Sequence, residues 1–116
     1  MTIDVFKLGY VEMLLLFLLK DHDAHGYQLV QMLEERSGGV LTMKAASQYP
    51  VLNRLMEDGY ISGKEVYVER KTPSKVKRPA RMRFVYHLEP SGHKRLNDLL
   101  MEHKAFTEAC NTVFRI

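Results

Sequence analysis

Six consecutive apolar residues, Leu14–Leu19, leave no polar side on the first helix that the chain can form. The surrounding pattern predicts that this helix covers residues 8–20. A helix that is apolar on every side has to be buried on every side. In a chain of 116 residues, the protein's own core can cover one side, and we expect a partner subunit to cover the other.

Two further helices are predicted before any strand. Apolar residues at helical spacing indicate a second helix over residues 26–37, ended by the pair Gly38-Gly39. A third helix is expected between a cap at Thr42 and a stop at Gly59, with an inner face made of Ala45, Tyr49, Leu52, Leu55 and Met56. Pro50 conflicts with an uninterrupted helix, because proline removes one backbone hydrogen bond, so this helix either starts late or kinks.

The second half of the chain contains a predicted hairpin and a final helix. Residues 60–68 and 82–88 alternate β-branched and aromatic side chains, which is typical of paired strands. Pro90 suits the first turn of a last helix over residues 91–116. We therefore predict a mostly α fold with a small β-hairpin: a winged helix-turn-helix over residues 1–89 and a C-terminal dimerisation helix over residues 90–116.

The positive charge of the chain is concentrated in the hairpin. Seven of the seventeen Lys and Arg residues lie between Glu69 and Arg83, against one acid. Residues 60–89 carry eight bases and three acids, whereas the remainder carries nine bases and eleven acids. A local excess of this kind favours a hairpin that lies along a polyanion, and nucleic acid is the leading candidate. The alternative is a solvated loop that its own charges keep open.

Several functional classes are disfavoured by composition. The single cysteine, Cys110, excludes an internal disulfide and fits a reducing compartment. The longest apolar run, Met13–Leu19, is too short to span a bilayer, and the N-terminus lacks the pattern of a secretory signal, so we expect a cytoplasmic protein. No metal site is expected at His22 and His25, because no further ligand is placed to complete one. No cofactor or catalytic pattern is found, which argues against an enzyme.

Five stretches of the chain resemble the PadR family of bacterial winged-helix transcriptional regulators, and together they cover nearly its whole length. They are Leu8-Gly9-Tyr10-Val11-Glu12-Met13-Leu14, His25-Gly26-Tyr27-Gln28-Leu29, Ser47-Gln48-Tyr49-Pro50-Val51-Leu52-Asn53-Arg54-Leu55, Glu57-Asp58-Gly59-Tyr60-Ile61 and Tyr86-His87-Leu88. The single terminal helix resembles the family's short subclass. The chain departs from the family pattern at Gln48, where an apolar residue is usual, and at Glu89-Pro90, where the last helix usually opens with Thr.

The resemblance implies that the third helix enters the major groove of DNA. Its outward face is predicted to hold Lys44, Ser47, Gln48, Val51 and Arg54. Gln48 can pair with an adenine edge, Ser47 with several bases and Val51 with a thymine methyl group. Lys44 and Arg54 are expected on phosphates, which position the protein without reading sequence. The alternative for this face is an ordinary solvated helix surface.

Two further sets of DNA contacts are expected. Tyr49 fits the inner face of the third helix by spacing, whereas the family resemblance implies that its phenol reaches a backbone phosphate. In the wing, we expect contacts to phosphates or the minor groove from Lys75, Lys77, Arg78 and Arg81.

The last helix carries an apolar seam that predicts a homodimer. Leu96, His103 and Cys110 repeat every seven residues, as do Leu99, Phe106 and Val113. The alternative is a helix packed on its own domain. We expect the dimer to use this seam together with Leu14, Phe17 and Leu18 of the first helix. A twofold dimer places its recognition helices about 34 Å apart, so the target is expected to be a near-palindrome.

The predicted function is sequence-specific DNA binding by a transcriptional regulator. The family resemblance implies repression, and release by a small aromatic or amphipathic ligand bound between the subunits. Phe17 and Phe106 are candidates for lining such a site, although core packing is the other reading of these residues. The alternative function is a winged-helix protein-interaction module whose hairpin grips an acidic partner.

Overall fold

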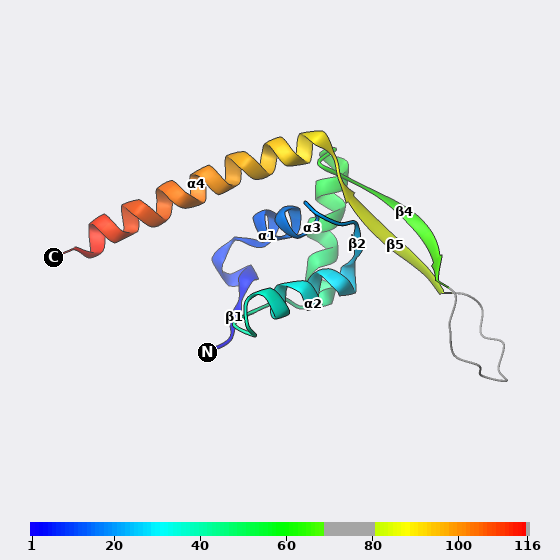
Figure 1. Ribbon diagram of the computed structural model, residues 1–116, viewed down its shortest axis with the longest axis horizontal. Helices are drawn as coiled ribbons and strands as arrows, with labels where there is room; N and C mark the ends of the chain where they lie inside the picture. The colour runs from blue at the N-terminus through cyan, green and yellow to red at the C-terminus, as the bar shows by residue number, and fades with distance from the viewer. Residues whose placement is uncertain (69–80, 116) are drawn as a thin grey trace.

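The computed structural model of the protein describes residues 1–68 and 81–115. Figure 1 shows the shorter helices grouped together, with the hairpin leaving on one side and a long helix on the other. In chain order the elements are β1 (Ile3–Asp4), the 3-10 helix η1 (Val5–Leu8), α1 (Val11–Leu18), β2 (Ala24–His25), α2 (Gly26–Arg36), β3 (Leu41–Thr42), α3 (Ala45–Glu57), β4 (Ile61–Val68), β5 (Arg81–Leu88) and α4 (Pro90–Phe114). The predicted fold class is confirmed.

The first α-helix is shorter than predicted and is covered by its own chain. Gly9 has a φ of 71°, a left-handed conformation that ends η1 and separates it from α1. Leu15 and Leu16 in the middle of α1 are fully buried, and Leu18 is 3% exposed, because α2, α3 and α4 all pack against this helix. The expectation that α1 needs a partner subunit to cover its second side is therefore wrong for most of the helix, although Phe17 stays partly exposed.

Helices α2 and α3 form the helix-turn-helix. Between them, β3 pairs in parallel with β1, so the N-terminus of the chain is tied to the turn. Helix α3 begins at Ala45 and continues through Pro50 to Glu57. Thr42 does not cap it, since the N-cap position is Lys44 and the Thr42 hydroxyl instead donates a hydrogen bond to Glu34 Oε1 at 3.2 Å.

The wing is a three-stranded sheet in the order β2-β5-β4. Strands β4 and β5 are antiparallel, with Ile61 opposite Leu88 at the base and Val68 opposite Arg81 at the far end. Strand β2 pairs with β5, a contact that was not predicted from the sequence. Because Ile61 and Leu88 are buried in the core, the base of the hairpin is anchored while its far end extends away from the helices (Figure 1).

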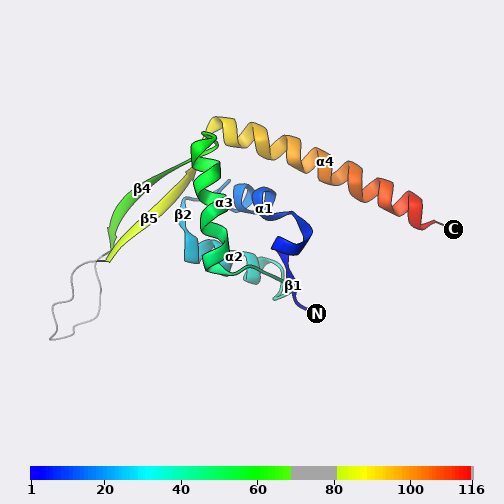
Figure 2. The ribbon, with the colours of Figure 1, turned by 180° about the vertical axis from the view of Figure 1, so that it is seen from behind.

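Helix α4 has two differently packed halves. Its N-terminal half lies against α1, where Leu96 is 1% exposed and Arg95 donates a hydrogen bond to Glu12 Oε1 at 3.0 Å. Its C-terminal half extends beyond the other helices, as both views of the ribbon show (Figures 1 and 2). The winged-helix core is therefore completed by the first turns of α4 and does not close without them.

Candidate nucleic-acid interface

The exposed face of α3 differs from the predicted one at three side chains, those of Ala45, Gln48 and Tyr49. Lys44, Ser47 and Arg54 are exposed, and Val51 is half-buried. Gln48 is 0% exposed, so its predicted contact with an adenine edge is wrong. The inward stripe runs through Gln48, Leu52 and Leu55, at spacings of four and three residues, and this leaves Ala45 and Tyr49 exposed instead of on the inner face.

Gln48 joins α3 to the first turn of α2. Its Nε2 donates a hydrogen bond to the carbonyl oxygen of Gly26 at 2.7 Å. A Cβ atom on residue 26 would lie 2.8 Å from that nitrogen, so the close approach of Gln48 requires glycine. The other amide atom, Oε1, is buried without a hydrogen-bond partner among the described residues.

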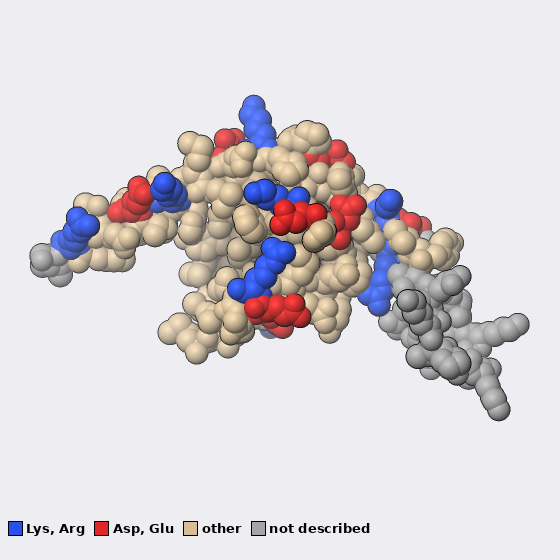
Figure 3. Space-filling view, viewed as in Figure 1, with Lys and Arg blue, Asp and Glu red and all other residues tan. Residues whose placement is uncertain are grey.

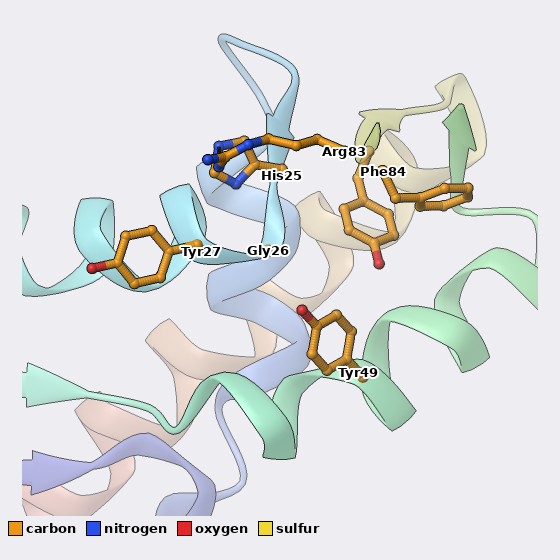
Figure 4. Close-up of a pocket in the computed structure, with 7 residues that line it drawn as sticks. His25, Gly26, Tyr27, Tyr49, Arg83 and Phe84 are labelled. Carbon is orange, nitrogen blue, oxygen red and sulfur yellow. Dashed lines mark hydrogen bonds between the residues drawn. The ribbon is translucent and has the colours of Figure 1, made fainter. Parts of the chain in front are cut away.

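A cavity of about 470 Å³ opens at the N-terminal end of α2, beside this contact. Figure 4 shows Tyr49 rising from α3 toward Gly26, while Arg83 reaches over to His25 from β5. The rings of Tyr27 and Tyr49 are 59% and 50% exposed. The lining residues, which come from three separate parts of the chain, are His25, Gly26, Tyr27, Tyr49, Arg83, Phe84 and Tyr86.

His25 caps α2 through a reciprocal pair of hydrogen bonds. The backbone N–H of Gln28 donates to His25 Nδ1 at 3.3 Å, and the backbone N–H of His25 donates to Gln28 Oε1 at 3.0 Å. On the other side of the ring, Arg83 Nη1 lies 2.8 Å from Nε2. Burial, followed by the charge of Arg83, lowers the pKa of His25 below its usual value of 6.5, so the ring is neutral at pH 7.

Tyr86 closes the cavity on the side of the sheet. It is buried, and its ring meets that of Phe84 edge-on at a centroid distance of 5.2 Å. Burial, followed by the neighbouring Tyr49 phenol, raises the pKa of Tyr86 above its usual value of 10. The hydroxyl group therefore keeps its proton at physiological pH. The residues that line the cavity include one permanent cation, Arg83, and no carboxylate.

The predicted wing contacts fall mostly outside the described residues. This applies to Lys75, Lys77 and Arg78, while Arg81 is the first residue of β5. On the face seen in Figure 3, Lys and Arg side chains lie on the described part of the hairpin together with acidic ones, and both signs of charge are also interspersed over the helices.

The residues predicted for a dimer interface divide into three groups by exposure. Leu18 and Leu96 pack inside the core of the single chain, so they are not available to a partner. Along the extended half of α4, Phe106 and Val113 are 57% and 74% exposed. The remaining five, which are partly exposed, are Leu14, Phe17, Leu99, His103 and Cys110.

A second cavity, of about 300 Å³, lies between η1, the start of α1 and α4. Tyr10 and His103 meet there edge-on at a centroid distance of 5.2 Å. The cavity is open, and its lining includes apolar side chains and the acidic Glu12 and Glu102. The full set of lining residues is Leu8, Gly9, Tyr10, Glu12, Met13, Leu99, Glu102, His103 and Phe106. Of the two residues proposed to line a ligand site, Phe106 lines this cavity and Phe17 does not.

The turn after α1 is held to the outer face of the wing sheet. His87 Nδ1 lies 2.7 Å from Asp23 Oδ1, and this hydrogen bond is the main cause that raises the pKa of His87 above 6.5.

Across residues 1–68 and 81–115, no group of three or more His, Cys, Asp or Glu side chains is arranged to hold a metal ion. None of the helices in this part of the chain has the length and apolar character that crossing a membrane requires.

Comparison with known proteins was made for both sequence and structure. Residues 15–98 match the family model described as the transcriptional regulator PadR-like family. No curated protein matches the chain. A solved transcriptional regulator from Clostridium thermocellum is 23% identical, with a TM-score of 0.75 over 96% of each chain. A PadR family transcriptional regulator from Eggerthella lenta is 22% identical, with a TM-score of 0.73 over 96% of this chain and 88% of that one.

A third solved structure, Bacillus subtilis PadR in complex with operator DNA, is 24% identical, with a TM-score of 0.63 over 78% of this chain and 45% of that one. At these identities the three structures support the fold, while the family model covers most of the sequence. The match confirms the prediction of a transcriptional regulator and not an enzyme. The chain belongs to the PadR-like family of transcriptional regulators.

Proposed function

We propose that the protein binds operator DNA as a homodimer and represses transcription from the cytoplasm. The observation that carries this proposal is the cavity at the N-terminal end of α2, where Tyr27, Tyr49 and Arg83 meet without a carboxylate. Helix N-termini favour anionic groups, because their backbone N–H groups and dipole face outward there. A DNA phosphate fits this chemistry, and Bacillus subtilis PadR, a protein of the same fold, has been solved with operator DNA.

Helix α3 supplies the proposed base contacts. In the major groove, its exposed Ser47 would hydrogen-bond base edges, and Val51 would contact a thymine methyl group with its exposed portion. Lys44 and Arg54 would bind phosphates on either side. Gln48 takes no part in this set, since its side chain is buried between α2 and α3.

The wing supplies the remaining backbone contacts. Basic residues in the stretch of sequence from the end of β4 to the first residue of β5 would contact phosphates or the minor groove; they are Lys75, Lys77, Arg78 and Arg81. Tyr49 would place its phenol on a phosphate from the exposed side of α3.

The homodimer would form along the extended half of α4. Exposed apolar side chains on a helix that leaves its own core need cover, and Phe106 and Val113 are such residues. Leu14, Phe17, Leu99, His103 and Cys110 would contribute their exposed portions. The two α3 helices of such a dimer would lie one DNA turn apart, about 34 Å, on a near-palindromic operator.

Release from DNA would follow from ligand binding next to α4. A small aromatic or amphipathic compound in the cavity between η1, α1 and α4 would contact Tyr10 and Phe106. Since α4 belongs to the proposed interface, a ligand that binds only one arrangement of the subunits would change the spacing of the recognition helices.

The test is binding to the DNA upstream of the protein's own coding sequence, measured by fluorescence anisotropy at several salt concentrations. The logarithm of the association constant should fall linearly with the logarithm of salt concentration, by about 0.9 for each phosphate contacted. Absence of salt-sensitive binding at low ionic strength would refute DNA binding. Tight binding of an acidic peptide by the same protein would then support the protein-interaction alternative.

A further inference from the structure

In the α2 cavity, the cap of α2 and Arg83 make competing demands on the two ring nitrogens of His25. A neutral imidazole has one nitrogen that carries a proton and one that accepts a hydrogen bond. The cap of α2 uses His25 Nδ1 as the acceptor, because the backbone N–H of Gln28 points at it. The proton of the neutral ring is then on Nε2.

Arg83 meets that same nitrogen. Its Nη1 lies 2.8 Å from His25 Nε2, and a guanidinium group can only donate. With the proton on Nε2, two N–H groups converge on one point of the cavity. The other tautomer would let Nε2 accept from Arg83, but it would place an Nδ1–H against the N–H of Gln28 and break the cap. In neither state does the ring satisfy both neighbours.

We propose that His25 and Arg83 jointly bind one phosphate of the DNA backbone, with His25 donating from Nε2. This inference rests on the proposed DNA-binding function and adds a phosphate ligand to it. An anionic oxygen accepts from both groups at once and leaves Nδ1 free to cap α2. The cap therefore selects the tautomer that binds DNA. The same imidazole ring caps α2 through Nδ1 and donates to the phosphate through Nε2.

The surroundings of the pair favour an anion. Arg83 is the permanent cation on the cavity lining, and no acidic side chain there competes for it. Tyr27 and Tyr49, from α2 and α3, line the same space and can donate from their hydroxyl groups. Burial and Arg83 keep the imidazole neutral in the free protein, which agrees with a ring that binds by donating a hydrogen bond and not by its charge.

Substitution can separate capping from phosphate binding. In His25→Asn, the side-chain oxygen can still cap α2, since asparagine is among the best N-cap residues, but the donor next to Arg83 is lost. In His25→Ala, both are lost. We expect His25→Asn to melt close to the wild type and to bind upstream DNA about tenfold more weakly. His25→Ala should lower both the melting temperature and the affinity.

The salt dependence distinguishes the two partners of the phosphate. Arg83→Gln removes a cation and should make the log-log slope shallower by about 0.9, whereas His25→Asn should leave the slope unchanged because the ring is neutral. His87→Asn is the matched control, since this histidine lies on the outer face of the sheet and bonds to Asp23 instead. It should bind DNA as the wild type does.

Three results would overturn the inference. If His25→Asn binds DNA as tightly as the wild type, His25 only caps the helix. If a long-range proton–nitrogen NMR spectrum of the imidazole shows the proton on Nδ1, the donor assignment is wrong. If the wild type itself shows no salt-sensitive binding to DNA, the proposed function fails together with this site, whereas the first two results leave that function intact.

Discussion

The side-chain amide of Gln48 donates a hydrogen bond to the carbonyl oxygen of Gly26 at 2.7 Å, across the two helices of the helix-turn-helix. Residue 48 belongs to the segment of α3 that was predicted to contact DNA, yet its side chain is fully buried. One half of the amide is bonded and the other half, Oε1, is buried without a partner among the described residues. Gln48 therefore sets the packing of α3 on α2 and does not read bases.

Replacing Gln48 with methionine should change the free energy of unfolding by less than about 1 kcal/mol. The lost hydrogen bond is offset by removal of a buried, unpaired oxygen, and the two side chains are similar in size. Affinity for DNA and preference among operator variants should be unchanged. Urea unfolding and anisotropy titrations check both. A selective loss of discrimination at an A·T position would show that Gln48 reads DNA after all.

Gln48→Glu, which buries a charge, should lower the free energy of unfolding by about 3 kcal/mol.

Replacing Gly26 with alanine should destabilise the protein by about 1 to 3 kcal/mol, because the new Cβ would lie 2.8 Å from Gln48 Nε2. The double variant Gly26→Ala with Gln48→Ala should be less destabilised than the sum of the single variants, since the clash disappears. Urea unfolding of the four proteins measures this coupling. Strict additivity would mean that the two residues do not limit the approach of α2 and α3.

Replacing Val113 or Phe106 with glutamate should convert the proposed dimer to a monomer. Both side chains are largely exposed on the extended half of α4, and a charge in a buried interface is strongly unfavourable. The winged-helix core should stay folded, because Leu18 and Leu96 pack within one chain. Sedimentation equilibrium gives the mass, and circular dichroism tests the fold. Asn97→Asp, an exposed position near the start of α4, is the control. A wild type that sediments as a monomer would refute the dimer.

Replacing Asp23 with asparagine should lower the pKa of His87 toward 6.5, because the hydrogen bond to Asp23 is the main cause of its raised value. A histidine whose pKa is raised by folding stabilises the protein fully below pH 6.5, and this contribution is lost as the pH rises through the raised pKa. Asp23→Asn should remove that part of the pH dependence. NMR titration of the His87 ring checks the pKa, with the other histidine signals as internal references. An unchanged titration midpoint would show that the pair does not form in solution.

Much of the fold could be predicted because its signals are local. Gly38-Gly39 ends α2 where the glycines occur, and the alternating pattern of residues 60–68 and 82–88 identifies the hairpin. The candidate site was predicted less well. Helical spacing alone allows more than one inward stripe on α3. Tyr49 was predicted as an inner residue and Gln48 as an outer one, and both predictions were wrong. A glutamine is not expected in a core, so the sequence favoured the wrong stripe. A glycine at residue 26 signals a close approach, but it does not name the side chain that approaches.

The sequence by itself determined the order of the four α-helices and the hairpin, the basic wing and the family of this protein, because periodicity, turn residues and motifs act over short stretches of chain. Only the tertiary structure decided that Gln48 meets Gly26, 22 residues away, and that His25 meets Arg83, 58 residues away. It also decided that Leu18 and Leu96 fill the chain's own core and are not left for a partner. Such contacts depend on how α2, α3, α4 and the sheet pack together, and no local pattern encodes the pairing of residues so far apart in the chain.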